Sequence, residues 1–220
     1  FANLLDKVAQ VNPKLRIRFS TSNPQDMGID VIETVAKHNN ICNYIHLPVQ
    51  SGSNRILALM NRGYDREKYI TLIENIKKRI PDCAISMDII TGFCSETKED
   101  HQQTLSLMDS VKYDYGYMFK YSERPKTLAE RKYKDDVKDP IKSLRLSEII
   151  ALQQKHSLYH HKKRIGQIFE VLVEGRSKRS KDELFGRNTQ NSVAIFPKGK
   201  LKPGDYVNVK ITDCTSATLI

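Results

Sequence analysis

The feature that most constrains this fold is a regular alternation of apolar and amphipathic segments along residues 1–163. Short runs rich in β-branched and aromatic residues predict four strands, at 15–21, 43–49, 83–90 and 115–122. Amphipathic helices are predicted before and between them, at 1–12, 26–40, 54–61, 65–80 and 96–111. Asp26 is the expected N-cap of the second helix. This order requires a parallel sheet covered by helices, either open or closed into a barrel.

The loops after the four predicted strands carry most of the candidate polar ligands. They read STSNP, VQSGSN, TGFCSE and YSERPKT. Because parallel strands end at the same edge of a sheet, these loops meet where α/β folds build their sites. Each loop alone is better explained by the turn-forming preferences of its residues. Four such loops at one end favour a ligand site.

A second, smaller domain is predicted after residue 163. A long helix at 139–163, with Pro140 near its start, leads into a different pattern beyond Gly166. Five short apolar segments separated by polar turns predict strands at 168–175, 184–188, 192–197, 205–214 and 216–220. This spacing is typical of a small five-stranded β-barrel, so we expect one domain at 1–163 and another at 164–220.

Positive charge is denser in the smaller domain. The chain has 36 Lys and Arg against 26 Asp and Glu, and residues 164–220 hold ten basic and six acidic residues, a net +4. The candidate RNA contacts in this domain lie in the loop after the first predicted strand and at the end of the second: Arg176, Lys178, Arg179, Lys181, Arg187 and Asn188. Clustered cations neutralise phosphates, and Phe185 or Phe196 offers a stacking face. A solvated basic loop beside core phenylalanines explains the same pattern.

The four cysteines, at 42, 83, 94 and 214, are separated by 41, 11 and 120 residues. No pair has the short spacing of a zinc or iron–sulfur motif, so we expect reduced thiols and no metal site in this chain. No apolar run approaches the roughly 20 residues that span a bilayer, and we expect no membrane association. The sequence begins at Phe1 within a predicted helix, which suggests a portion of a longer protein.

Three motifs make the sequence recognisable: HLPVQSGSN (46–54), DIITGFCSET (88–97) and MFKYSERPKT (118–127). The match extends to RFSTSNPQDM (18–27), NRGYDREKY (61–69) and VLVEGRSKRSKDELFGRNTQN (171–191). Together these segments resemble the MiaB-type tRNA methylthiotransferases, which are radical S-adenosylmethionine (SAM) enzymes. The resemblance covers nearly the whole chain.

The resemblance implies that residues 1–163 are the carboxy-terminal part of a partial, TIM-like (β/α) radical-SAM barrel. Residues 164–220 would be a TRAM domain, the small β-barrel that binds tRNA. The loops after the strands would line the cofactor S-adenosylmethionine. The cofactor-binding residues implied in this way are Ser20, Ser22, Gln50, Ser51, Asp88, Gly92, Phe119 and Tyr121.

Structural alternatives stay open for several of these positions. Asp88 lies inside an apolar strand, and a buried carboxylate requires a partner, which is either a neighbouring side chain or a ligand. One of Phe119 and Tyr121 is expected in the barrel core. Arg124 is a candidate contact for RNA or for the cofactor carboxylate, with helix capping or an ion pair as the alternative. No catalytic residue is assigned.

The implied activity belongs to a full-length cytoplasmic enzyme. It adds a methylthio group to C2 of N6-isopentenyladenosine at tRNA position 37, with S-adenosylmethionine, two [4Fe-4S] clusters and a reductant system. The Cys-x-x-x-Cys-x-x-Cys loop that holds one cluster is absent from this sequence, so this chain alone is expected to be inactive. Two alternatives remain. The substrate is threonylcarbamoyl-adenosine in tRNA or a ribosomal-protein aspartate, or this chain is an RNA-binding module without catalysis.

Cys94 departs from the family pattern, which often has proline there and glycine in place of Ser95. We therefore interpret Cys94 as a turn residue. Gly92 is the more informative position, because a glycine lets the backbone pass close to a bound nucleoside.

Overall fold

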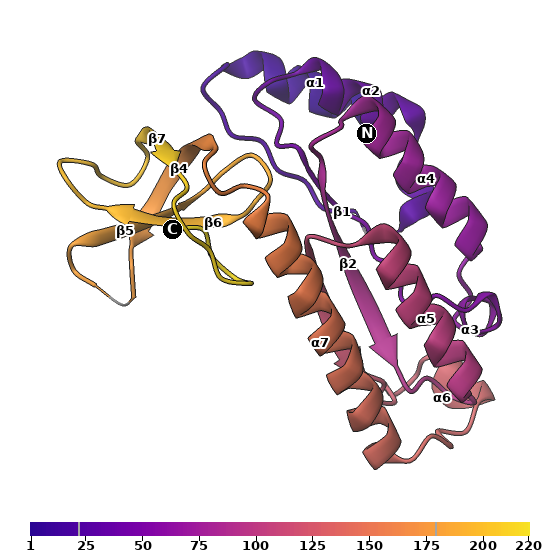
Figure 1. The fold of residues 1–220 in the computed structure, drawn as a ribbon. Helices are drawn as coiled ribbons and strands as arrows, with labels where there is room; N and C mark the ends of the chain where they lie inside the picture. Colours follow the sequence, from indigo (N-terminus) through magenta and orange to yellow (C-terminus); the bar gives the residue numbers. More distant parts are fainter. Residues whose placement is uncertain (22, 179) are drawn as a thin grey trace.

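The computed structural model describes residues 1–21, 23–178 and 180–220. A 24-residue helix, α7 (Asp139–Lys162), runs from a larger α/β lobe to a carboxy-terminal β lobe (Figure 1). Pro140 lies in its first turn, as the sequence predicts, where the missing backbone N–H costs nothing.

The larger lobe alternates helices and strands. In chain order its elements are α1 (Ala2–Val11), the 3₁₀ helix η1 (Pro24–Asp26), α2 (Ile29–Lys37), β1 (Tyr44–His46), α3 (Asn54–Leu59), α4 (Arg66–Arg79), β2 (Ala84–Thr91), α5 (Lys98–Val111), β3 (Tyr115–Lys120) and α6 (Leu128–Lys132). The three strands form a parallel sheet in the order β1-β2-β3. The alternation in the sequence is thus realised as a partial α/β arrangement.

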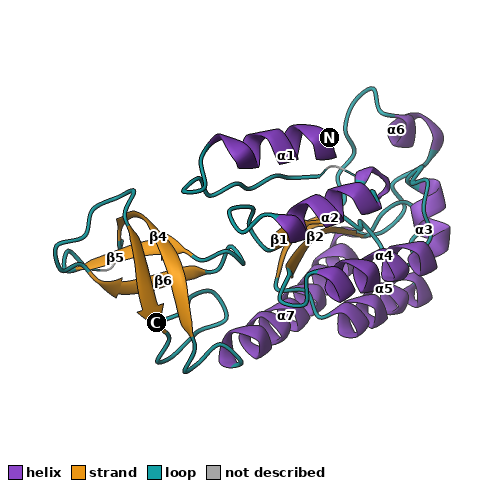
Figure 2. Ribbon diagram, turned by 90° about the horizontal axis from the view of Figure 1, so that it is seen from above, coloured by secondary structure: helices purple, strands orange, loops and turns teal. Residues whose placement is uncertain are grey.

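One face of this sheet is covered and the other is not. Ile45, Ile85, Met87 and Ile89 are at most 1% exposed. They pack against residues of α4, α5 and α7, which lie along one side of the sheet (Figure 2). Because strand side chains alternate, the residues between them point to the opposite, open face. The covered face is the main hydrophobic core of the protein.

The carboxy-terminal lobe is a curled antiparallel sheet in the order β6-β5-β4-β7 (Figure 1). Its strands are β4 (Ile168–Arg176), β5 (Glu183–Arg187), β6 (Val193–Pro197) and β7 (Tyr206–Lys210). A small separate core fills the curl, and it includes Val171, Leu184, Phe196 and Leu219. Phe196 is therefore a core residue and not a stacking surface.

Two predicted strands are reduced to single pairings. The segment 15–21 pairs only through Ile17 with Ile41, because the neighbouring strand begins regular pairing only at Tyr44. The segment 216–220 pairs through Leu219 alone, with Ala194 and Cys214. The carboxy-terminal sheet therefore has four regular strands where the sequence suggested five.

The predicted N-cap at Asp26 is also wrong. Asp26 ends η1, and α2 begins at Ile29 with Gly28 as its N-cap. The Asn23 side chain instead accepts from the Gln25 N–H at the start of η1. The extra 3₁₀ turn thus shifts the helix start by three residues.

Polar contacts join the two lobes. Arg16 Nη2 lies 2.7 Å from Glu170 Oε1, and Arg164 Nη2 lies 2.9 Å from Asp114 Oδ1. Tyr206 donates its hydroxyl to the Lys14 carbonyl at 2.8 Å. The irregular segment 15–21 therefore serves as much for docking the carboxy-terminal lobe as for extending the sheet.

Gly92, just after β2, is held in the left-handed region at φ +71. A Cβ built there would lie 2.3 Å from Cγ of Lys142. Lys142 is buried and cannot easily move, because its Nζ donates to Asp135 Oδ1 at 2.6 Å and to the Tyr121 carbonyl at 3.2 Å. The close packing of Lys142 in α7 therefore explains why a glycine is needed at position 92. The sequence suggested a different reason, the close approach of a nucleoside.

Gly92→Ala is expected to lower the free energy of unfolding by about 3 kcal/mol, the sum of left-handed strain and overpacking. Gly166→Ala is the matched control. It also has a positive φ, +85, but no atom of the described residues lies within 4 Å of a Cβ built there, so only about 1–2 kcal/mol should be lost. Urea unfolding of the full-length variants measures both. Equal losses would contradict the close contact with Lys142.

Candidate cofactor and nucleic-acid site

The open face of the sheet carries polar and aromatic side chains. Parallel pairing sets His46 beside Ser86 and Asp88 beside Tyr117, so these residues share one face. Tyr115, Tyr117 and Phe119 are 51%, 48% and 53% exposed. Three half-exposed aromatic rings on one strand form an apolar surface that suits stacking of a planar ligand.

A cavity of about 480 Å³ lies at the carboxyl end of this face. It brings together five of the residues predicted from the sequence: Gln50, Asp88, Phe119, Tyr121 and Arg124. Gln50 reaches it from a left-handed backbone conformation, φ 70, and pairs with Ile89 across the sheet. Amide, carboxylate, guanidinium and aromatic groups from strands β2 and β3 and from the loops after β1 and β3 thus surround one space.

Phe119 and Tyr121 have different surroundings. Phe119 exposes its ring, whereas Tyr121 packs edge-on against Phe93 at 4.8 Å between ring centroids. The Lys142 ammonium lies 5.2 Å from the centre of the Tyr121 ring. Burial, reinforced by the neighbouring Cys94 thiol, raises the pKa of Tyr121 to about 12, so its hydroxyl is a donor at neutral pH. Tyr121 is accordingly the more core-like residue of the two.

Other predicted cofactor residues lie outside this cavity. Ser51 is buried, with its Oγ 3.3 Å from Thr104 Oγ1 and accepting from the Ser53 N–H. Gly92 contacts Lys142, as described above. Ser20 is exposed and does not line the cavity. Ser22 is outside the described residues. We therefore assign Ser51 and Gly92 to the structural support of the loops.

Cys94 is 2% exposed and packs with Ile56 and Phe93. Burial raises the pKa of its thiol, which is therefore protonated at neutral pH. Across residues 1–21, 23–178 and 180–220, no three His, Cys, Asp or Glu side chains gather in a way that could hold a metal ion. The interpretation of Cys94 as a buried turn residue agrees with this packing.

Asp100 fastens two of the loops together. Its carboxylate accepts from Arg55, from Ser53 Oγ at 2.6 Å and from the Thr97 N–H at 2.8 Å. Burial by itself would raise the pKa of Asp100, but these donors outweigh it and hold the pKa well below 3.8. The loop after β1 and the loop after β2 are thus joined by one ionised carboxylate.

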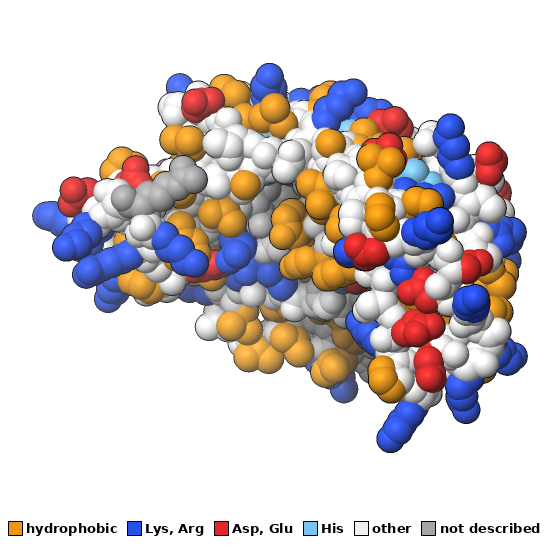
Figure 3. Space-filling model, turned by 90° about the horizontal axis from the view of Figure 1, so that it is seen from below, with side chains coloured by type: hydrophobic (Ala, Val, Ile, Leu, Met, Phe, Trp, Pro, Cys, Tyr) orange, Lys and Arg blue, Asp and Glu red, His pale blue; other side chains and the backbone are white. Residues whose placement is uncertain are grey.

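The predicted RNA contacts divide into exposed and engaged residues. Arg176, Lys178 and Lys181 are exposed in the β4–β5 hairpin. Lys and Arg side chains gather at the outer end of the carboxy-terminal lobe (Figure 3). Arg179 is outside the described residues. The hairpin therefore presents a solvent-accessible cationic surface.

Arg187 and Asn188 are engaged within the protein. Arg187 pairs with Glu174. Asn188 is 1% exposed, and its side-chain oxygen accepts from the Ser192 N–H at 2.9 Å. Asn188 thus shapes the β5–β6 turn, and its contact with RNA stays a prediction that this burial does not favour. The sequence motif does not distinguish a buried turn asparagine from an exposed one.

Sequence reasoning missed four residues at the junction of the lobes. Tyr44 and His46 lie on the open face, and Gln190 and Asn191 lie in the β5–β6 turn. Gln190 donates to Asp82 Oδ2 at 2.8 Å. The available signal was the two-residue spacing of Tyr44 and His46, and of Ser86 and Asp88, in otherwise apolar strands.

Asp100→Asn is expected to lower the free energy of unfolding by about 2 kcal/mol at pH 6, because a charge-assisted network is lost. The pKa of Asp100 is lowered on folding, so its stabilisation is present above pH 3.8 and is lost as the pH falls below that value. The difference between the variant and the unmodified protein should therefore shrink at pH 3. Glu74→Gln, an exposed carboxylate in α4, is the control. A pH-independent difference would contradict the lowered pKa.

Two family models match the chain. The radical SAM superfamily model matches residues 1–108, and the TRAM domain model matches residues 162–220. A solved structure of coproporphyrinogen III oxidase from Escherichia coli, described as a radical SAM enzyme, covers 86% of this chain and is itself covered to 51%. The two share a TM-score of 0.57 at 17% identity. This likeness supports the fold alone.

Curated relatives match over the entire chain. They are proteins named tRNA-2-methylthio-N(6)-dimethylallyladenosine synthase, from Christiangramia forsetii (62% identical over 220 residues) and Flavobacterium johnsoniae (58% over 219 residues). Each match covers 100% of this chain and 46% of the relative. The chain thus spans about half the length of the curated relatives it matches. Residues 1–108 thus match the radical SAM superfamily, residues 162–220 match the TRAM domain, and the whole chain is similar to about half of these relatives of the MiaB type.

Proposed function

We propose that the full-length protein adds a methylthio group to C2 of N6-isopentenyladenosine in tRNA, and that this chain supplies part of its cofactor site and its TRAM domain. The observation that carries the proposal is the 62% identity over all 220 residues to a relative named for this product. The boundary that we propose between the two domains is at residues 163 and 164. A cytoplasmic location agrees with a tRNA substrate. In the described part of the chain no helix is long and apolar enough to cross a bilayer.

The cavity at the carboxyl end of the open face fits part of S-adenosylmethionine. Phe119 offers a ring face for an adenine, and the Gln50 amide and Asp88 carboxylate suit ribose hydroxyls. Arg124 suits a carboxylate, which it can hold by paired hydrogen bonds. Among residues 1–21, 23–178 and 180–220, the buried Tyr121 hydroxyl lies beside only the weakly hydrogen-bonding Cys94 thiol, so it is available as a donor. When bound, the cofactor supplies the radical chemistry of the family, and these residues orient it.

The iron–sulfur clusters of the family have no matching ligands among the described cysteines. Cys42, Cys83 and Cys94 are buried, and they do not gather into a metal-binding group. We propose that the two [4Fe-4S] clusters, and the reductant system that serves them, act through parts of the longer protein outside this chain.

The TRAM domain is proposed to hold the tRNA. The exposed hairpin with Arg176, Lys178 and Lys181 presents cations that suit phosphate groups. Phe185 is half-buried on β5 and offers limited stacking. On this proposal the RNA contacts the hairpin while its target base reaches the open face of the sheet, after leaving its stack.

Full-length protein with reconstituted clusters, S-adenosylmethionine, reductant and isopentenylated tRNA is expected to yield the 2-methylthio nucleoside, detected by mass spectrometry of digested RNA. Threonylcarbamoyl-adenosine tRNA and ribosomal-protein substrates are tested in parallel and should remain unmodified. Product on either of these and none on isopentenylated tRNA would replace the proposed substrate. No product on any substrate, with both clusters loaded, would refute methylthio transfer.

Lys178→Gln/Lys181→Gln is expected to weaken tRNA binding, because each lost phosphate contact removes a released counterion. The slope of log K against log salt should become shallower by about 0.7–0.9 for each contact that is lost. Filter binding at several salt concentrations measures both quantities.

Lys7→Gln/Lys98→Gln is the matched control for that variant. It removes the same charge from exposed lysines on α1 and α5, far from the hairpin in sequence. An unchanged slope for the hairpin variant, or an equal change in the control, would contradict a contact made by the β4–β5 hairpin.

A further inference from the structure

A row of neighbouring polar side chains crosses the open face of the sheet in the larger lobe. Tyr44 Oη lies 2.7 Å from Ser86 Oγ, and Ser86 Oγ lies 2.8 Å from His46 Nδ1. His46 Nε2 lies 3.4 Å from Asp88 Oδ2. Tyr44, His46, Ser86 and Asp88 alternate along β1 and β2, so strand pairing itself places them in a row.

This row has one direction when the imidazole of His46 is neutral. His46 Nε2 faces the Asp88 carboxylate, which can only accept hydrogen bonds, so this arrangement favours the Nε2–H tautomer. Its Nδ1 then has no proton and accepts from the Ser86 hydroxyl, which leaves Ser86 Oγ to accept from Tyr44. Every donor therefore points toward Asp88. Tyr117, 5.9 Å from His46 between ring centroids, packs edge-on over the row.

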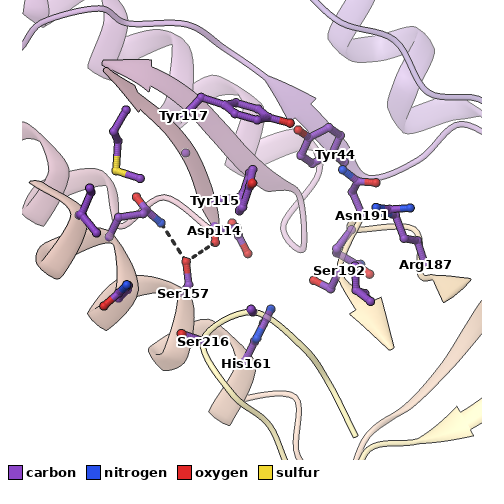
Figure 4. A pocket seen from close by; sticks show the side chains of 18 residues that line it. Tyr44, Asp114, Tyr115, Tyr117, Ser157, His161, Arg187, Asn191, Ser192 and Ser216 are labelled. Carbon is purple, nitrogen blue, oxygen red and sulfur yellow. Dashed lines mark hydrogen bonds between the residues drawn. The ribbon is translucent and has the colours of Figure 1, made fainter. Parts of the chain in front are cut away.

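The far end of the row touches the carboxy-terminal lobe. Figure 4 shows the side chains of Tyr44 and Asn191 next to each other. Both residues line a cavity of about 430 Å³ between the lobes, which Tyr115 and Ser192 line as well.

The β5–β6 turn, which contains Asn191, is held by several contacts. Asn188 is buried within it, and Asn191 has a left-handed backbone, φ 63. Gln190 anchors the turn to Asp82, which also accepts from Asn43 Nδ2 at 2.9 Å. Asn43 immediately precedes Tyr44. The β5–β6 turn is thus seated at the point where the row begins.

The two ends of the row face different spaces. Tyr44 lines the cavity between the lobes, and Asp88 lines the proposed cofactor cavity. We propose that the row Asn191–Tyr44–Ser86–His46–Asp88 is a positioning device, which fixes the Asp88 carboxylate for its ligand according to how the carboxy-terminal lobe is seated. His46, Ser86 and Tyr44 are accordingly positioning residues. The identity of that ligand, S-adenosylmethionine, rests on the proposed function.

The tautomer of His46 provides a direct test that does not need a loaded enzyme. Full-length protein without clusters is labelled with ¹⁵N in its histidine side chains, and the His46 signals are identified by their loss in His46→Gln. The unmodified protein should show His46 as the Nε2–H tautomer. Tyr44→Phe and Ser86→Ala should each shift it toward a mixture with the Nδ1–H tautomer, the second more strongly.

Tyr115→Phe is the matched control, because Tyr115 lies on the same face and lines the same cavity but is outside the row. It should leave the His46 signals unchanged. The Tyr44→Phe change keeps the ring and its packing, so a folded variant is available even where Ser86→Ala is destabilised. An unaltered His46 tautomer in Tyr44→Phe would overturn the proposal.

Cofactor affinity gives the second readout. S-adenosylhomocysteine binding to the full-length protein, measured by calorimetry, should weaken about threefold to tenfold in Asn191→Ala, Tyr44→Phe or Ser86→Ala, as expected for the loss of one hydrogen bond. In the Ser86→Ala background, Tyr44→Phe should cause no further loss, because the row is already interrupted. Fully additive losses would overturn transmission through Ser86.

The outcomes separate this inference from the proposed function. A shifted His46 tautomer and weakened ligand binding support the row even where no methylthio nucleoside is formed. Product formation with an unperturbed His46 in Tyr44→Phe and Ser86→Ala would overturn the row and leave the proposed function intact.

Discussion

The structure depends on the parallel pairing of β2 between β1 and β3. Side chains alternate between the two faces along each strand. The register of the parallel pairing therefore determines which face each residue of the three strands occupies. Ile45, Met87 and Ile89 go to the helices and form the core. The residues that alternate with them lie on the open face, where burial is incomplete and polar side chains contact one another. A one-residue slip would exchange these two sets, so the core and the candidate site are specified together.

The second constraint is the seating of the carboxy-terminal lobe. Salt bridges from Arg16 and Arg164, and the contact of Gln190 with Asp82, connect it to segments that lead toward the strands. These contacts are polar and several are partly exposed, so each is worth little by itself. Their number and spread over three segments give the lobe a defined position. A polar junction of this kind holds the carboxy-terminal lobe in place but still allows its position to change.

The sequence predicts the larger lobe well where the apolar pattern is long. Residues 83–90 and 139–163 were identified nearly to the residue, because β2 is buried on a covered face and α7 begins at a proline. The sequence-based prediction fails where strand formation depends on a neighbouring segment. Residues 15–21 have strand propensity but only one pairing neighbour, and Leu219 pairs singly. In the site, the strand ends were foreseen, as Gln50, Asp88 and Phe119 line one cavity. The binding roles of Gly92 and Asn188 stay predictions. Their contacts with Lys142 and Ser192 could not be predicted, because they depend on a distant segment of the sequence and on turn geometry.

The 24 residues of α7 have a consequence for recognition. At about 1.5 Å per residue, the helix is a rod of roughly 36 Å that separates the carboxyl end of the sheet from the carboxy-terminal lobe. A single nucleoside is far shorter than that rod. A ligand that reaches the cavity lined by Asp88 and the hairpin with Lys178 together must therefore be a polymer with a folded shape. On the proposed function, α7 therefore sets a minimum length for an RNA that contacts both sites at once.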